Sequence, residues 1–443
     1  MNTYTFKRIK SGLTPLTVAI AMLCGAPSAF AVAPAVGVVC TTAGANPTFN
    51  LDTKTGYISL PDGNTMFMWG YSVTGQPFQS PGPVLCVNEG DTVTVVLHNT
   101  LGEASSIMFP GQENVLAGPI AGPLTPAQPV GTGAALTSLT NSAATNGTVT
   151  YQFTASKPGT FIYESGTNPE KQVHMGLFGA LIVRPLAGAD HVNNRADSQF
   201  TTNGNSPSGT AWSEEFLALL SEIDPYEHQA AEGGMEFDLT YYHPHYWMLN
   251  GRGFPDSIAD NNAPWLPSQP YGAMARVHPY DGVGGLHPYP GVERYLNVGT
   301  MDFPFHPHGN NGLVIGRDGK ALEGPTGQDL AFEKFLMNVG PGQTWDISFK
   351  WYDAENYSLS NPVPVAQTDV ANLSYLLFYG GSPYLGKQGP LPPGITSLNQ
   401  CGEFYIISHN HSLFQINAWG LTMSGPITYM RVDPPLGPNN NCT

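Results

Sequence analysis

Charged residues are scarce in this 443-residue sequence, and basic ones especially so. Asp, Glu, Lys and Arg together make up 11% of the chain, with 17 Lys and Arg against 33 Asp and Glu. An acidic chain without basic clusters is a poor match for nucleic acid or an anionic membrane surface, so we expect neither as a partner. The composition is typical of a soluble secreted protein.

Long hydrophobic runs are also missing, apart from a short one near the N-terminus. Residues 13–26 are mostly apolar, follow three basic residues between positions 7 and 10, and precede Ala29-Phe30-Ala31. This pattern predicts a signal peptide over 1–31, cleaved after Ala31, because the apolar run is shorter than the roughly 20 residues that span a membrane. No later segment resembles a membrane span. We therefore expect an exported protein, periplasmic or extracellular.

Cysteine is rare, and the sequence contains no C-x-x-C motif. One of the five cysteines lies in the predicted signal peptide, which leaves Cys40, Cys86, Cys401 and Cys442. Four cysteines in an oxidising compartment indicate two disulfides. Of the three possible pairings we favour Cys40–Cys86 with Cys401–Cys442, each within one half of the chain. The wide spacing argues against a thiolate metal site.

Helical periodicity is almost absent, whereas glycine (51) and proline (40) are abundant. Apolar and polar residues instead alternate with period two in many short segments, which predicts strands joined by turns. The predicted strands are 91–99, 147–155 and 159–165, which alternate, 178–185, which is apolar throughout and predicted to be buried, and 214–224, 245–251, 275–279, 311–319, 343–351, 402–409 and 427–433. Only residues 329–339 hint at a helix.

A polar segment divides the chain. Residues 189–210 are rich in Asn, Ser, Thr and Gly, and we interpret them as a linker between a first domain, 32–188, and a second domain, 211–443. We find no short tandem repeat. The two domains nevertheless end in similar strands, "GALIVRP" and "ITYMRVDPP", which is consistent with two copies of one β-sandwich.

Two of the histidine pairs indicate metal binding. His306 and His308 flank a proline, His409 and His411 flank an asparagine, and strand alternation places both imidazoles of each pair on one face. If the two strands are neighbours, four nitrogens converge, a ligand set that suits Cu, Zn or Ni better than Ca or Mg.

The remaining histidines have simpler interpretations. His243 and His245 form a second His-Pro-His pair, but no further ligand converges on it in the sequence, so we interpret both as solvated or structural. Five others stand singly, and we place them on surfaces or in turns: His98, His191, His228, His278 and His287.

These histidine segments resemble known copper motifs. "FPFHPHGNNGLVIGRDG" (303–319) is similar to the penultimate copper motif of the multicopper oxidases, and "GEFYIISHNHSLFQINAWG" (402–420) to their terminal His-Cys-His motif. Further similar segments follow in order at 87–111, 159–183 and 241–258. The resemblance implies an all-β fold of two cupredoxin-like Greek-key β-sandwich domains, copper as cofactor, and O2 or a small molecule as substrate.

The sequence departs from that family at most copper ligands. The type 1 copper positions, which hold His, Cys and His in the family, carry Phe303, Asn410 and Gln415, so we expect no type 1 copper. The two histidine pairs of the first domain are replaced within Met108–Gly111 and by Glu164-Ser165-Gly166. Only the four histidines of the second domain remain, enough to saturate one ion.

Three first-domain residues are further candidates near such a site. Glu164 offers an oxygen ligand, with His174 or Met175 beside it. We favour a structural interpretation, in which Glu164 caps a strand end and His174 and Met175 pack beneath it.

Two functions therefore compete. In the first, His306, His308, His409 and His411 hold one or two copper ions, and the protein, if it is an enzyme, is a copper-dependent oxidoreductase. In the second, the chain is a non-enzymatic secreted cupredoxin scaffold for surface assembly, adhesion or copper sequestration. A homo-oligomer remains open, because two-domain members of the family often form trimers. A hydrolase is disfavoured, since the sequence has no G-x-S-x-G and no H-E-x-x-H.

Overall fold

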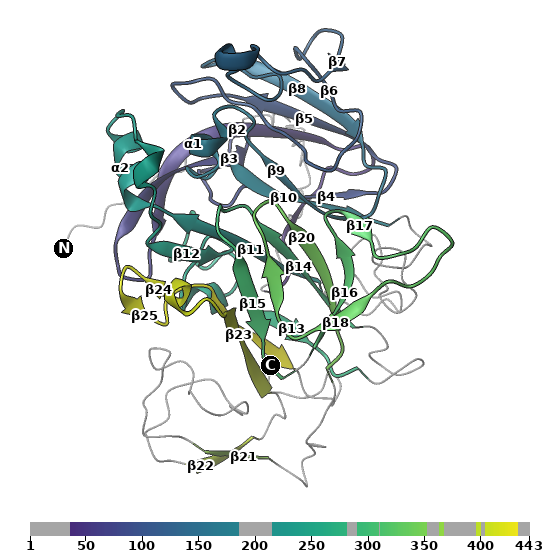
Figure 1. Ribbon diagram of the computed structural model, residues 1–443, viewed down its shortest axis with the longest axis vertical. Helices are drawn as coiled ribbons and strands as arrows, with labels where there is room; N and C mark the ends of the chain where they lie inside the picture. The colour runs from purple at the N-terminus through teal and green to yellow at the C-terminus, as the bar shows by residue number, and fades with distance from the viewer. Residues whose placement is uncertain are drawn as a thin grey trace, which may run out of the picture. The chain divides into compact units, whose positions relative to one another are not determined.

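Strands dominate the computed structural model of this protein (Figure 1). It describes residues 36–185, 215–280, 290–309, 311–351, 363–366, 396–399 and 404–432. All of them belong to one compact unit, residues 33–443. No helix among them is long and apolar enough to cross a membrane. The predicted signal peptide, the predicted linker and the Cys401–Cys442 pair lie outside the described residues.

The first half of the chain forms two sheets that face each other. One has the strand order β1 (Cys40–Thr41), β4 (Val84–Asn88), β10 (Phe178–Arg184), β9 (Gly159–Glu164). The other has the order β3 (Thr65–Val73), β2 (Thr48–Ser59), β5 (Thr92–His98), β8 (Thr148–Thr154), β6 (Leu116–Gly118), β7 (Thr125–Pro126). The connections include α1 (Pro169–Gln172) and a short 3-10 helix, η1 (Gly133–Ala135).

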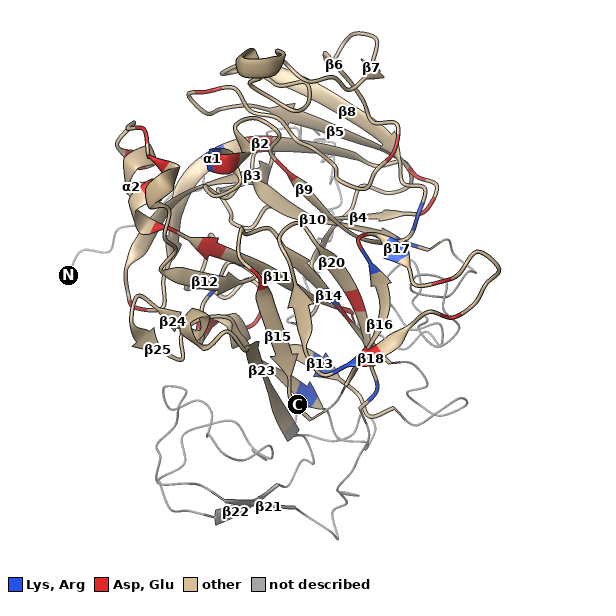
Figure 2. Ribbon diagram, in the orientation of Figure 1, with Lys and Arg blue, Asp and Glu red and all other residues tan. Residues whose placement is uncertain are grey.

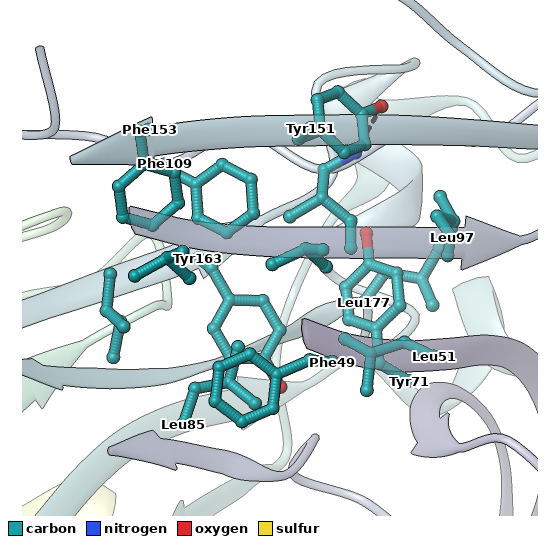
Figure 3. Packing of buried hydrophobic residues seen from close by; sticks show 14 of the residues in the cluster. Phe49, Leu51, Tyr71, Leu85, Leu97, Phe109, Tyr151, Phe153, Tyr163 and Leu177 are labelled. Carbon is teal, nitrogen blue, oxygen red and sulfur yellow. Dashed lines mark hydrogen bonds between the residues drawn. The ribbon is translucent and has the colours of Figure 1, made fainter. Parts of the chain in front are cut away.

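Alternate residues of both sheets meet in one core (Figure 3). Leu85 and Tyr163 come from the smaller sheet, and Leu51, Tyr71 and Phe153 come from the larger one. The buried tyrosines keep their hydroxyls satisfied: that of Tyr163 donates to the Pro83 carbonyl at 2.6 Å. The period-two pattern therefore buries one side of each sheet, as a sandwich requires.

The second half forms a larger sandwich. The first sheet has the order β17 (Lys320–Ala321), β16 (Gly312–Arg317), β20 (Thr344–Phe349), β14 (Gly291–Asn297), β11 (Glu215–Ile223), β12 (Tyr246–Leu249), β24 (Asn417–Ala418), β25 (Leu421–Thr422), with β18 (Phe332–Lys334) beside β16. The second has the order β13 (Ala275–Val277), β26 (Ile427–Val432), β23 (Phe404–Asn410), β15 (Phe303–Pro307), β19 (Met337–Val339). A separate pair is β21 (Val363–Ala366) with β22 (Thr396–Asn399).

Helical segments of the second half are short and lie at the ends of strands. They are α2 (Pro225–Glu232) and the 3-10 helices η3 (Leu239–Tyr241), η4 (Asp256–Ile258) and η5 (Leu413–Ile416). α2 was not predicted from the sequence, although its start signal is present. Asp224 caps the helix by accepting from the Tyr226 and Glu227 amides, and Pro225 occupies the first turn.

The strands predicted from alternation are all present, whereas the helix predicted over 329–339 is wrong. That segment contains β18 and β19 instead. Phe332–Lys334 pairs with β16, and Met337–Val339 pairs with β15, where Val339 lies opposite Phe303. These pairings with distant strands outweigh a weak local helical preference. The domain boundaries at 188 and 211 fall outside the described residues and stay a prediction.

The two halves pack through the outer faces of two sheets. Val84, Ile162 and Ile182 from the first half share one apolar cluster with Leu219 and Leu296 from the second. Charged residues are sparse along the strands (Figure 2), yet a group of them lies buried at this junction.

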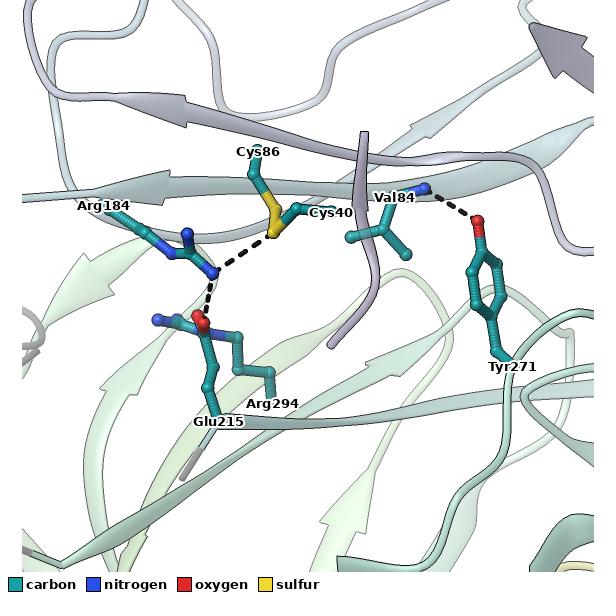
Figure 4. The surroundings of a disulfide bond; sticks show 7 residues. All are labelled: Cys40, Val84, Cys86, Arg184, Glu215, Tyr271 and Arg294. Atoms are coloured by element: carbon teal, nitrogen blue, oxygen red, sulfur yellow. Dashed lines mark hydrogen bonds and ion pairs between the residues drawn. A yellow bond between two sulfur atoms is a disulfide. The ribbon is translucent and has the colours of Figure 1, made fainter. Parts of the chain in front are cut away.

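That group is a network of ion pairs (Figure 4). Glu215 of β11 accepts from Arg184 of the first half and, at 2.7 Å, from Arg294 of β14. Arg294 also donates to Asp346 at 3.1 Å and to the Thr160 hydroxyl at 2.9 Å. Burial alone would raise the pKa of Glu215, but the two arginines outweigh it and lower that pKa to about 2. The halves are therefore joined by charge as well as by apolar packing.

The predicted Cys40–Cys86 disulfide is confirmed, with Cα atoms 5.4 Å apart. It ties β1 to β4 beside the ion network, where Arg184 donates to Cys40 Sγ at 3.2 Å. On the same sheet the Val84 amide donates to the Tyr271 hydroxyl of the second half at 3.2 Å.

Candidate metal centre

The two predicted histidine pairs lie on neighbouring strands. β15 and β23 are antiparallel, with His306 directly opposite His409. The Pro304 carbonyl accepts from the His411 amide at 2.7 Å, and the His308 amide donates to the Ile407 carbonyl at 3.0 Å, so the pairing continues past both strand ends. The sheet therefore brings all four histidines together.

The four imidazoles form one cluster. Ring centroids lie 4.7 Å apart for His306 and His308, 5.1 Å for His308 and His409, and 5.4 Å for His409 and His411. The fourth side of the cluster, from His306 to His411, measures 5.4 Å. His306 and His409 are half-buried, while His308 and His411 are exposed. Solvent and small molecules therefore have access to the cluster.

Backbone carbonyls fix the protonation of two of these rings. His306 Nδ1 lies 2.6 Å from the Phe335 carbonyl oxygen, and His409 Nδ1 lies 2.8 Å from the Asn410 carbonyl oxygen. A carbonyl only accepts, so each Nδ1 carries the proton and each Nε2 keeps a lone pair. Histidines that bind metals commonly donate their other ring N–H to a backbone carbonyl in this way.

His308 and His409 are in direct contact, with their Nε2 atoms 3.0 Å apart. In the structure this is a hydrogen bond, in which His308 donates to the lone pair of His409. Two nitrogens bound to one ion at about 2.0 Å lie roughly 2.8–3.3 Å apart, so the same separation suits two ligands of one metal. Burial first, and then the neighbouring imidazoles, lower the pKa of His308. Both rings therefore favour the neutral form that binds a metal.

The four imidazoles are chemically suited to copper or zinc, although their present arrangement does not have the geometry of a metal-bound site. Among the described residues no group of three or more His, Cys, Asp or Glu side chains has the geometry to hold an ion. The His308–His409 hydrogen bond occupies the lone pair that a metal would use. Binding would require His308, which is exposed, to release this hydrogen bond and the proton on its Nε2.

The residues that the resemblance places at the family's type 1 copper position are uncharged. Asn410 donates its amide to Gln415, which in turn donates to the Asp302 carbonyl at 3.3 Å. Phe303 is fully buried in the core beside them. Two amides and a phenyl ring offer neither thiolate nor imidazole, so these residues do not fit a blue copper ion.

The first-half positions are likewise part of the fold rather than of a ligand set. Met108 and Glu164 pair through their backbones, with the Met108 amide 2.6 Å from the Glu164 carbonyl. Burial raises the pKa of the Glu164 carboxyl. Met175 is fully buried in the first core, whereas His174 Nδ1 lies 3.0 Å from Glu227 Oε2 of the second half. Nothing in the sequence pattern indicated this His174–Glu227 contact.

Comparisons with known proteins agree with this architecture, which is that of two cupredoxin-like β-sandwiches. Residues 67–188 match the family model of the multicopper oxidases. The solved structure of a multicopper oxidase, mgLAC, is similar at 17% identity and a TM-score of 0.52, covering 89% of this chain and 88% of that one. A blue copper oxidase from Nitrosomonas europaea is similar at 17% identity and a TM-score of 0.52, covering 87% and 85%. No curated protein matches the sequence.

These matches confirm the predicted all-β fold and the resemblance. Residues 67–188 match the multicopper oxidase family model, and the chain as a whole has a fold similar to that of the solved multicopper oxidases. The matched segment includes Met108 and Glu164, positions at which the resemblance implies histidines in the family. At 17% identity the structural similarity establishes the fold alone.

Proposed function

We propose that this chain is an exported copper-binding protein of multicopper-oxidase fold with a mononuclear copper centre at four histidines and no type 1 copper. His306, His308, His409 and His411 hold the ion. The observation that carries the proposal is the convergence of four imidazoles on one sheet, with two Nε2 atoms 3.0 Å apart.

The surrounding residues prepare the histidines for this role. The carbonyls of Phe335 and Asn410 hold the Nδ1 protons of His306 and His409, which aims the Nε2 lone pairs away from the backbone. The exposed side of the cluster admits O2 or a small molecule directly. Bound copper supplies one-electron redox chemistry at such a position.

The same structure limits the substrate. Because Asn410 and Gln415 replace the ligands of the electron-accepting copper, a bulky donor has no relay toward the four histidines. Met108 and Glu164 supply no imidazole for additional coppers. The substrate is therefore a small molecule that reaches the cluster itself, and copper-dependent oxidoreductase activity is expected to be modest.

The test is copper content on the mature protein purified from its own host, with an electron paramagnetic resonance spectrum of the same sample. We expect about one copper per chain with a normal, non-blue signal. The double variant His306→Ala/His409→Ala should lose it, while His98→Ala, an exposed histidine of β5, should not. Unchanged copper in the double variant would refute the proposal. Sequencing the mature N-terminus tests cleavage after Ala31.

A second candidate is a non-enzymatic scaffold for assembly, adhesion or copper sequestration. It is favoured by Phe303, a fully buried apolar side chain at a position where the resemblance implies a copper-ligating histidine. In this case the protein would take up no copper after incubation with Cu(II), or would bind it without redox turnover. Light scattering would then show whether it associates into larger assemblies.

A further inference from the structure

The His243-Pro244-His245 segment lies at the start of β12, away from the four-histidine cluster in the fold. β12 belongs to the larger sheet of the second half, whereas β15 and β23 belong to the smaller one. Figure 1 shows β24 and β25 next to β12. The Trp419 amide, in the turn that joins β24 and β25, donates to the His245 carbonyl at 2.8 Å. A surface of residues distant in sequence thus assembles around this pair.

The two rings are spaced like the pairs of the four-histidine cluster. The centroids of His243 and His245 lie 5.0 Å apart, between the 4.7 Å of His306 and His308 and the 5.4 Å of His409 and His411. The His-x-His spacing thus produces the same separation at all three places. His243 is exposed and His245 is half-buried.

Hydrogen bonds fix the backbone at His243 and the position of the ring proton of His245. The His243 amide donates to Asp224 Oδ2 at 2.6 Å, at the capping residue of α2. Pro244 lies between the two histidines, and its ring fixes the backbone φ angle at that position. His245 Nδ1 lies 2.7 Å from the His243 carbonyl oxygen and must donate to it, so His245 Nε2 keeps a lone pair. His245 is therefore preorganised to present Nε2 to an ion, and the His243 ring lies on an anchored backbone beside it.

Aromatic rings hold His245 in place. The Trp419 ring lies 4.7 Å from the His245 ring, and Tyr226 lies 5.9 Å from His245 and 5.8 Å from Trp419. Trp419 has a φ of +44°, a left-handed conformation that a bulky residue rarely adopts. It nevertheless remains 44% exposed. Backbone strain of this kind concentrates at functional positions.

We propose that His243 and His245 form a second metal site, which takes one divalent ion of the Cu(II), Zn(II) or Ni(II) class. Each histidine gives one imidazole nitrogen, and water completes the coordination. Imidazole donors select these ions over Ca and Mg. With two protein ligands instead of four, the site binds more weakly and exchanges its ion more readily than the four-histidine cluster. This proposal stands independently of copper binding at His306 and His409.

Trp419 provides a local readout. Cu(II) is paramagnetic and quenches a nearby indole, whereas Zn(II) does not. Titrating the metal-free protein with Cu(II) should give a quenching step in tryptophan fluorescence and a second equivalent of bound copper. Zn(II) added first should block that step, and Trp419→Phe should remove the quenching while keeping the second equivalent.

The decisive experiment compares two double variants, one at each proposed metal site. His243→Asn/His245→Asn should lose the quenching step and one equivalent of copper, while His306→Ala/His409→Ala should retain both. The single variant His243→Asn changes an exposed side chain, so it serves if the double variant fails to fold. His98→Ala is the matched control for an exposed histidine. Copper binding and quenching that are unchanged in both His243 variants would overturn the proposal, whatever happens at the other site.

Discussion

His308 and His409, which are about a hundred residues apart in the sequence, meet with their Nε2 atoms 3.0 Å apart across two antiparallel strands. The contact exists because β15 and β23 pair in a register that places His306 opposite His409. A shift of that register by one residue would turn one histidine pair to the other face of the sheet. The register is therefore the structural condition for the metal centre.

Replacing His308 by Ala should weaken copper binding at least about tenfold, because one of four imidazole ligands is lost and water takes its place. His308 is exposed, so the fold should be unaffected. Competition with a chelator of known affinity measures the change. An affinity equal to that of the wild-type protein would show that His308 is not a ligand.

Restoring the family's type 1 ligands should create a blue copper site. The triple variant Phe303→His/Asn410→Cys/Gln415→His replaces a phenyl ring and an amide pair by two imidazoles and a thiolate. Copper-thiolate coordination of this kind gives an intense visible absorption that four imidazoles cannot give. An absorption spectrum after copper loading checks this, with Asn410→Ser as the control without a thiolate. If the triple variant folds, binds copper and stays colourless, the assignment of these positions is wrong.

Glu293 of β14 should make stability depend on pH around neutrality. Burial raises the pKa of its carboxyl to about 7, while the Tyr295 hydroxyl donates to it at 3.0 Å. The folded state therefore binds a proton more tightly than the unfolded state, whose pKa is near 4.5. The stabilisation that the protonated Glu293 carboxyl gives the folded state is complete below pH 4.5, and it is lost as the pH rises through 7.

Glu293→Gln, which stays neutral, should thus be more stable than the wild-type protein at pH 8, by up to about 3 kcal/mol. At pH 4.5 the two proteins should have nearly the same free energy of unfolding. Urea unfolding at both pH values gives the comparison. A difference that does not change with pH would contradict the raised pKa.

Glu215→Ala should destabilise the protein by about 3–5 kcal/mol, because it leaves Arg184 and Arg294 buried without their shared carboxylate. In the wild-type protein the same stabilisation is present above pH 4.5 and is lost as the pH falls toward 2, since the folded pKa of Glu215 is lowered. Glu113→Ala breaks the exposed ion pair with Lys157 and should leave unfolding nearly unchanged. If both substitutions lowered the free energy of unfolding equally, the buried network would stabilise the protein no more than an exposed ion pair does.

Much of the fold was predictable because strand alternation is a local pattern. β5 and β8 follow the period of two in their own residues, whereas β10 is a continuous, fully buried apolar run. The segment 329–339 was not predictable in this way, because its strands depend on partners elsewhere, such as Phe303 opposite Val339. Its own residues favour no structure strongly, so tertiary pairing decides.

Part of the candidate metal centre was also predictable from the sequence, and part was not. His-x-His spacing on a strand predicts that both rings share a face, and that inference needs no partner. The tautomers of His306 and His409 depend on the carbonyls of Phe335 and Asn410, which only the folded chain places there. The packing of Trp419 on His245 likewise joins two segments that no sequence periodicity relates.

The charged network between the two halves has a consequence for how the halves recognise each other. Arg184 and Thr160 come from one half, and Glu215, Arg294 and Asp346 from the other, so neither half contains a complete set of partners. Apolar surfaces tolerate many docking arrangements, whereas these donors and acceptors are satisfied in one. Two fragments, one for each half, should therefore have low solubility when expressed separately. When they are mixed, they should bind each other specifically and form one complex with the native arrangement.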